Sequence, residues 1–324
     1  MSRSAHAAGG PGLVSVVIPV YNRASTIGRA LASVQRQTCP PDEILVVDDG
    51  STDASCAVVA ALATQDASIR LLRETRNGGG AAARNTGLRA ARGELVAFLD
   101  SDDEWLDGHL EQRMATLRSD PDVALVFGAF YLDDGRTTIP QPCQPLAGDP
   151  LVYVFSGRGG FRTSTFAGRK AALLEVLFDD RLRKHQDWDL VLNLAHRRFR
   201  VAADPQPTAV LHIASHDRLS AKPDHEASKL FYLKNRQHGS RSGWVLFCTI
   251  MLERAFRAER RGTNFRYYLA TLKNIDSRAG AIVGVLTALL YIPRLGRRLF
   301  RAACTSYCLA TADARDRGAA QRSH

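Results

Sequence analysis

The first hundred residues alternate between short apolar, largely β-branched runs and longer segments with the apolar spacing of a helix. The predicted strands are residues 14–19, 43–47, 69–72 and 95–99, and the predicted helices between them are residues 27–34, 54–63 and 81–91. Strands that are apolar along their whole length must be covered on both faces. The alternation therefore predicts an α/β fold with a mainly parallel sheet flanked by helices.

Polar residues follow three of the predicted strands at the point where each strand ends. They are Tyr21-Asn22, Asp48-Asp49 and Asp100-Ser101-Asp102-Asp103. In sheets of this kind the ligand lies beyond the carboxyl ends of the strands. We expect the three groups to converge on one crevice.

The acidic turn after the fourth strand favours a metal site. Three carboxylates this close repel one another unless a cation neutralises them, and hard oxygen ligands suit Mg²⁺ or Mn²⁺ together with substrate phosphates. The alternative is a solvated turn in which Asp102 or Asp103 caps the following helix.

Charge divides the chain of 324 residues into two parts. From residue 222 onward there are 19 Lys and Arg against 7 Asp and Glu, whereas the preceding part has 24 against 26. An N-terminal body without excess positive charge argues against a nucleic-acid groove, and a basic last third suits an acidic partner surface. The six cysteines form no disulfide framework or zinc pattern.

Further elements are predicted downstream, with a Pro- and Gly-rich loop or lid over residues 136–160. The predicted helices are residues 106–118, 171–177, 187–195, 243–256 and 265–272, and the predicted strands are residues 123–130, 201–202 and 208–213. Residues 279–292 are uncharged. This run is shorter than the about 20 residues of a spanning helix, so an interfacial helix or hairpin is expected.

Four motifs, in their order and spacing, resemble those of the family 2 glycosyltransferases with the GT-A fold. They are the segments VSVVIPVYN at 14–22, ILVVDDGSTD at 44–53, NGGGAAARN at 77–85 and GELVAFLDSDD at 93–103. The resemblance is strong over residues 13–132, weaker to about residue 220, and does not cover the basic third. It implies a Rossmann-like, mixed and mainly parallel sheet, to which this chain adds a C-terminal helical extension.

The resemblance also implies how a nucleotide-sugar donor, expected to be a UDP-sugar, is bound. Pro19 and Tyr21 would line the base pocket, and the Asp49 carboxylate would accept a hydrogen bond from the base. Arg84 would meet the donor sugar or phosphates, or else form a salt bridge on the helix surface.

The acidic turn is similar to the family's DxD-type motif. Asp100 would hold ribose or sugar hydroxyls, Asp102 would bind Mn²⁺ or Mg²⁺, and Asp103 would be a neighbouring or alternate ligand. His216 is the expected third ligand, with His212 as the alternative.

The catalytic base of an inverting transferase is a carboxylate that deprotonates the acceptor hydroxyl. The family places it at the head of a helix, where Asp187 stands here, and Trp188 would stack on the acceptor sugar. Gln186 departs from the Glu that the family often has, which removes a negative charge beside Asp187. The alternative is that Asp187 only caps the helix.

The resemblance implies an inverting glycosyltransferase that acts on a glycan or lipid-linked acceptor in surface polysaccharide or glycolipid assembly. The alternative is a catalytically inactive, glycosyltransferase-like subunit that binds a partner or lipid. A dehydrogenase is not expected, because no G-x-G-x-x-G follows the first strand. A nucleotidyltransferase fits poorly, because it would want a Gly-rich loop with a basic residue at that turn.

The expected organisation has four parts. Residues 1–12 form a tail, residues 13–221 the catalytic domain (nucleotide half 13–104, acceptor half 105–221), residues 222–310 a basic helical extension and residues 311–324 a second tail. The extension either packs on the catalytic body, with Phe247, Leu252 and Phe256 in its core, or lies on an anionic membrane. We expect a cytoplasmic protein, peripheral on the cytoplasmic face of the inner membrane.

Overall fold

The computed structural model describes residues 12–213, 224–259 and 262–286, with the isolated residues 299, 302, 303 and 306. Apart from Gly12, the two predicted tails lie outside this part of the chain, as do residues 287–292 of the uncharged run.

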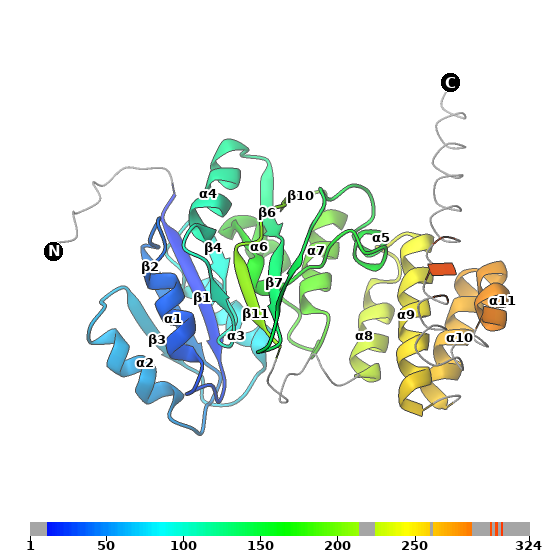
Figure 1. The fold of residues 1–324 in the computed structure, drawn as a ribbon, viewed down its shortest axis with the longest axis horizontal. Coiled ribbons are helices and arrows are strands. Elements are labelled where there is room, and N and C mark those ends of the chain that lie inside the picture. Colours follow the sequence, from blue (N-terminus) through cyan, green and yellow to red (C-terminus); the bar gives the residue numbers. More distant parts are fainter. Residues whose placement is uncertain are drawn as a thin grey trace.

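A seven-stranded sheet forms the centre of the molecule (Figure 1). Its order is β10-β6-β9-β4-β1-β2-β3, and its pairs are parallel except at β9, which is antiparallel to both neighbours. The strands are β1 (Val14–Val20), β2 (Glu43–Asp48), β3 (Ile69–Arg73), β4 (Leu95–Phe98), β6 (Val123–Gly128), β9 (Ala167–Arg169) and β10 (Arg200–Asp204). The predicted mainly parallel sheet is confirmed.

Helices cover both faces of this sheet because successive side chains of each strand point to opposite faces. Val16 and Ile18 belong to one apolar core and Val17 to the other. The first core takes side chains from α1 (Ile27–Gln35), α2 (Ser55–Ala63) and α4 (His109–Ser119). The second takes them from α3 (Gly80–Ala90), α6 (Lys170–Val176) and α7 (Gln186–His196).

A second sheet of four strands has the order β5-β11-β7-β8. Its strands are β5 (Glu104–Trp105), β7 (Phe130–Asp133), β8 (Thr138–Gln141) and β11 (Ala209–His212). The prediction of one continuous strand over residues 123–130 is wrong, because the chain leaves the large sheet after Gly128 and enters the small one at Phe130. The predicted loop over residues 136–160 contains β8 and the short helix α5 (Pro150–Phe155). A 3₁₀ turn, η1 (Thr163–Thr165), precedes β9.

Four helices of the basic third stack beside α5 and α7 at one end of the molecule (Figure 1). They are α8 (His225–Asn235), α9 (Arg241–Glu259), α10 (Thr263–Ile275) and α11 (Ser277–Leu286). Phe247, Leu252 and Phe256 are buried in a core that also contains Phe155 of α5 and Leu192 of α7. Among the described residues, none of the helices has the length and apolar character that a membrane span requires.

Helix α3 lies directly on β1 and β2, and Gly87 allows this close approach. A Cβ at this position would stand 2.4 Å from a methyl group of Val17 and 3.2 Å from one of Val47. These two valines are buried in the centre of the sheet. The approach matters for function because α3 carries Arg84.

Substitution of Gly87 by Ala should destabilise the fold by about 1–3 kcal/mol, because the added methyl group overpacks the contact between α3 and the sheet. The matched control is Gly28→Ala in α1, where a Cβ meets no atom within 4 Å. This control should be stabilised by about 0.4–1 kcal/mol, since alanine restricts the unfolded chain. Urea denaturation measures both free energies of unfolding, and equal effects of the two substitutions would contradict the close approach.

Candidate active site

Three neighbouring strands bring the predicted polar groups to one edge of the large sheet. β1 lies between β4 and β2 and is parallel to both. Tyr21, Asp49 and Asp100 therefore follow the carboxyl ends of adjacent strands. The backbone N–H of Asp49 donates to the carbonyl of Val20, which holds two of these ends together.

The carboxylate of Asp49 organises the Gly-rich loop before α3. Its Oδ1 accepts from the backbone N–H of Gly78 at 2.7 Å, and its Oδ2 accepts from that of Gly79 at 2.8 Å. Gly79 has φ = 89°, a conformation that glycine adopts without strain. Asp49 itself is buried, whereas Tyr21, directly after the neighbouring strand β1, is 43% exposed and accessible to a ligand.

The carboxylates of the acidic turn fall into two groups. Asp103 is buried, where it accepts from the Ser164 hydroxyl at 2.6 Å and from the backbone N–H of His212 at 3.3 Å. The Ser164 oxygen in turn accepts from the backbone N–H of Asp100 at 3.2 Å. The side chains of Asp100 and Asp102 remain 33% and 22% exposed. Asp103 thus stabilises the turn from its buried side, and the carboxylates of Asp100 and Asp102 are the ones that a ligand can reach.

The chemistry of Asp100 and Asp102 fits a hard divalent cation that takes one or two carboxylates and completes its shell with phosphate oxygens and water. Asp103 fits less well, because both of its oxygens accept hydrogen bonds from the protein. His212 lies between Asp133 and Glu104, at 2.9 and 3.0 Å from its two ring nitrogens. His216 lies outside the described residues. Within the described part of the chain, no group of three His, Cys, Asp or Glu side chains is arranged around a metal position.

Arg84 links the acidic turn to helix α7. Its guanidinium donates to Asp100 Oδ1 at 2.5 Å and to Gln186 Oε1 at 2.9 Å, and it also lies 5.5 Å from the centre of the Phe178 ring. The Arg84 side chain is only 9% exposed. The sequence left open whether Arg84 meets a ligand or forms a surface salt bridge, and the structure shows an ion pair inside the candidate site.

Asp187 is the second residue of α7, next to the Gln186 that Arg84 contacts. Its side chain is 20% exposed, and Arg162 lies 3.9 Å from its Oδ2. Burial raises the pKa of the Asp187 carboxyl, and the positive charge of Arg162 is the strongest effect opposing this shift. A raised pKa suits a general base.

The site also contains two arginines, Arg162 and Arg23, that the sequence motifs did not identify as site residues. Arg162 stands before η1, with its guanidinium 5.5 Å from the Phe130 ring centre. Arg23 lies 3.8 Å from the Asp102 carboxylate. Both contacts join segments far apart in the chain, so local spacing carries no signal for them.

Trp188 packs within an aromatic cluster. Its ring stacks on His185 at 4.3 Å between ring centres and meets Phe155 edge-on at 5.0 Å. Its Nε1 has no hydrogen-bond partner among the described residues. The expected stacking on an acceptor sugar stays a prediction, because the contacts seen are with the protein's own rings.

A family model described as "Glycosyl transferase family 2" matches residues 15–178 of the chain. A similar protein is the amylovoran biosynthesis glycosyltransferase AmsB of Erwinia amylovora, 29% identical over 68% of this chain and 76% of its own length. This chain spans only 37%, 41% and 39% of the length of three further glycosyltransferases that it matches.

Two solved structures share the fold. S. aureus TarS 1-349 in complex with UDP-GlcNAc has a TM-score of 0.65 at 19% identity, over 92% of both chains. The mannosyltransferase PcManGT from Pyrobaculum calidifontis, in complex with GDP-Man and Mn²⁺, has a TM-score of 0.52 at 22% identity, over 93% of this chain and 86% of that one. At these identities the likeness shows the GT-A fold alone.

Alanine substitutions should separate the roles of Asp102 and Asp103. Asp103→Ala leaves the buried Ser164 hydroxyl and the His212 N–H without their acceptor, so it should destabilise the fold by about 1–3 kcal/mol. Asp102→Ala removes a partly exposed carboxylate and should change stability by less than about 1 kcal/mol. Urea denaturation of both variants checks this, and a larger loss for Asp102→Ala would contradict the assignment.

Proposed function

The chain belongs to glycosyl transferase family 2, and we propose that it transfers a sugar, with inversion, from a nucleotide-sugar to a hydroxyl of a glycan or lipid-linked acceptor. The observation that carries the proposal is the Arg84 bridge. It joins Asp100, at the donor end of the sheet, to Gln186, the neighbour of the candidate base. The bridge would thereby keep Asp100, on the side proposed for the sugar donor, in one site with Asp187, on the side proposed for the acceptor.

The donor half would bind the nucleotide at the ends of β1 and β2. Pro19 and Tyr21 would line the base pocket, and an Asp49 oxygen that already fixes the Gly loop would accept from the base N–H. A carboxylate acceptor suits the N3–H of uracil, which is why we propose a UDP-sugar. The presence of UDP-GlcNAc in the similar TarS structure supports this choice.

Asp102 would hold a divalent cation, Mn²⁺ or Mg²⁺, with Asp100 holding hydroxyl groups of the donor. When bound, such a cation supplies positive charge that stabilises the leaving diphosphate. The Mn²⁺ in the structure of the similar mannosyltransferase supports this proposal. His216 remains a candidate further ligand.

Asp187 would act as the general base. As the acceptor oxygen bonds to the anomeric carbon, its proton passes to the Asp187 carboxylate, and the bond from that carbon to the diphosphate oxygen breaks with its electrons. The nucleoside diphosphate leaves on the opposite side, so the anomeric configuration inverts. Arg162 and Arg84 would keep enough of Asp187 ionised to accept the proton.

The basic extension would bring the enzyme to its acceptor. We propose the division into residues 13–221 and 222–310, with peripheral binding to an anionic membrane on the cytoplasmic face. The excess of basic residues after residue 222 supports this, as do the exposed Leu230 and Leu233 of α8. The name of the Erwinia relative supports a biosynthetic role, here in surface polysaccharide or glycolipid assembly.

A donor screen tests the proposal. The full chain is incubated with Mn²⁺ or Mg²⁺, UDP-, GDP- and dTDP-sugars and a membrane extract as the source of acceptor. Release of nucleoside diphosphate from one UDP-sugar is expected, and Asp102→Ala should reduce it by about 100-fold or more because leaving-group stabilisation is lost. No release and no nucleotide binding with any donor would contradict the proposal and favour an inactive subunit.

Removal of Arg162 should change the pH dependence of transfer. Asp187 must be ionised to act, so activity is lost as the pH falls through its raised pKa. Arg162→Ala removes the charge that opposes this rise, so the acid limb of the kcat profile should move to higher pH. Arg162→Lys keeps the charge and is the matched control. An unchanged acid limb in Arg162→Ala would contradict the pairing of Arg162 with the base.

A further inference from the structure

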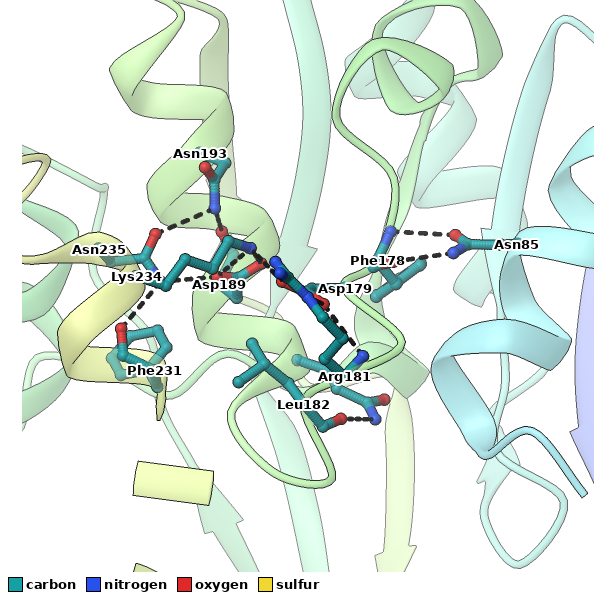
Figure 2. A network of polar contacts seen from close by, with 11 residues as sticks. Asn85, Phe178, Asp179, Arg181, Leu182, Asp189, Asn193, Phe231, Lys234 and Asn235 are labelled. Carbon is teal, nitrogen blue, oxygen red and sulfur yellow. Dashed lines mark hydrogen bonds and ion pairs between the residues drawn. The ribbon is translucent and has the colours of Figure 1, made fainter. Parts of the chain in front are cut away.

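A buried carboxylate fastens α7 to the helical extension. Asp189, two residues after Asp187, is 1% exposed. Lys234 of α8 donates to its two oxygens at 2.9 and 2.7 Å, and the amide of Asn235 donates at 2.7 Å (Figure 2). A buried carboxylate without these partners would be strongly unfavourable. The first turn of α7, which carries Asp187, is thus bound to α8.

The same ammonium group reaches the segment that leads into α7. Lys234 lies 2.8 Å from Asp179, whose carboxylate also accepts from Arg181 at 2.9 and 2.7 Å (Figure 2). The hydrogen bond from Arg181 is the main cause, and Lys234 a further one, of a strongly lowered pKa of Asp179. Asp179 stays charged, and Lys234 pairs with a carboxylate on each side of the turn between α6 and α7.

This segment is tied to the donor half by Asn85 of α3. The Asn85 amide donates to the carbonyl of Phe178 at 2.8 Å and accepts from its N–H at 3.0 Å (Figure 2). Phe178 contacts the guanidinium of Arg84 through its ring. The side chain of Gln186 also donates to the carbonyl of Leu182, within the same segment.

A second tether joins α8 to the start of α7. His185, with φ = 65°, precedes the helix, and its Nε2 lies 2.8 Å from the Ser228 hydroxyl. Burial, with the charges of Arg254 and Lys184, lowers the pKa of His185 to about 3, so the ring is neutral. Of the two tethers, only the one through Lys234 carries charge.

We propose that Lys234 is a positioning residue for the transfer step: by neutralising Asp189 and Asp179 together, it holds the head of α7 so that Asp187 and Gln186 face Asp100 and Arg84. The basic extension is then a part of the catalytic unit, although the family match ends at residue 178. The inference rests on the proposed function, because it concerns the placement of the base.

The experiment compares Lys234→Met, Lys234→Arg and the control Lys229→Met in the full chain. Lys229 is on the same helix, where it pairs with the exposed Glu226. For each variant, kcat and the KM for donor and acceptor are measured across pH, and nucleoside diphosphate binding is measured by calorimetry. The stoichiometry of binding gives the fraction of folded protein.

Lys234→Met should lower kcat by about tenfold or more, since a small misplacement of a catalytic group is costly. Its nucleotide Kd and donor KM should stay within about twofold of the unsubstituted chain, because no side chain proposed to bind the donor is substituted. Lys234→Arg should recover most of kcat, and Lys229→Met should match the unsubstituted chain.

Two results would overturn the inference: an unchanged kcat in Lys234→Met, or a loss of kcat that equals the fall in folded fraction. Should Lys234→Met not fold, Asp179→Asn replaces it. This milder variant keeps the size of the side chain and should lower kcat in the same direction without a change in nucleotide Kd. Absence of transfer by the unsubstituted chain would instead overturn the proposed function, a separate outcome.

Discussion

Arg84 joins the acidic turn after β4 to the start of helix α7 through two hydrogen bonds of one guanidinium group. Its guanidinium donates to Asp100 after β4 and to Gln186 at the start of α7, two positions separated by 86 residues in the sequence. The side chain is largely buried, where charged hydrogen bonds are stronger than in water. Among the described residues, Asp100 is the one carboxylate that hydrogen-bonds to Arg84. Gln186 is neutral, so position 186 adds no negative charge beside Asp187. The departure from the family's Glu therefore has a defined electrostatic consequence.

The groups around this bridge are held by the backbone as much as by side chains. Asp49 fixes two amides of the Gly loop, and Ser164 connects the buried Asp103 to the N–H of Asp100. Gly87 allows α3, and with it Arg84, to lie close against β1. A site built in this way is arranged before the substrate binds, which is the condition for efficient electrostatic stabilisation.

The sequence predicted the elements that depend on local pattern. Apolar runs and their polar ends placed β1 to β4 and brought Tyr21, Asp49 and the acidic turn to one edge of the sheet. It could not show that Asp103 is buried and Asp102 partly exposed, because adjacent carboxylates look alike in a sequence. The partners of Asp103 are Ser164 and His212, which lie far from the acidic turn in the chain. The split after Gly128 was missed for a similar reason, since an unbroken apolar run hides a change of sheet. The contacts of Arg162 with Asp187, and of Lys234 with Asp179 and Asp189, are long-range, so no local spacing indicates them.

A base on the side of the sugar opposite the leaving diphosphate makes one stereochemical outcome necessary. The most direct measurement is the anomeric configuration of the first transferred sugar, determined by NMR from the coupling constant of its anomeric proton. With an α-linked UDP-sugar as donor, a β-linked product is predicted. An α-linked product, formed with retention, would contradict the assignment of Asp187 as the base.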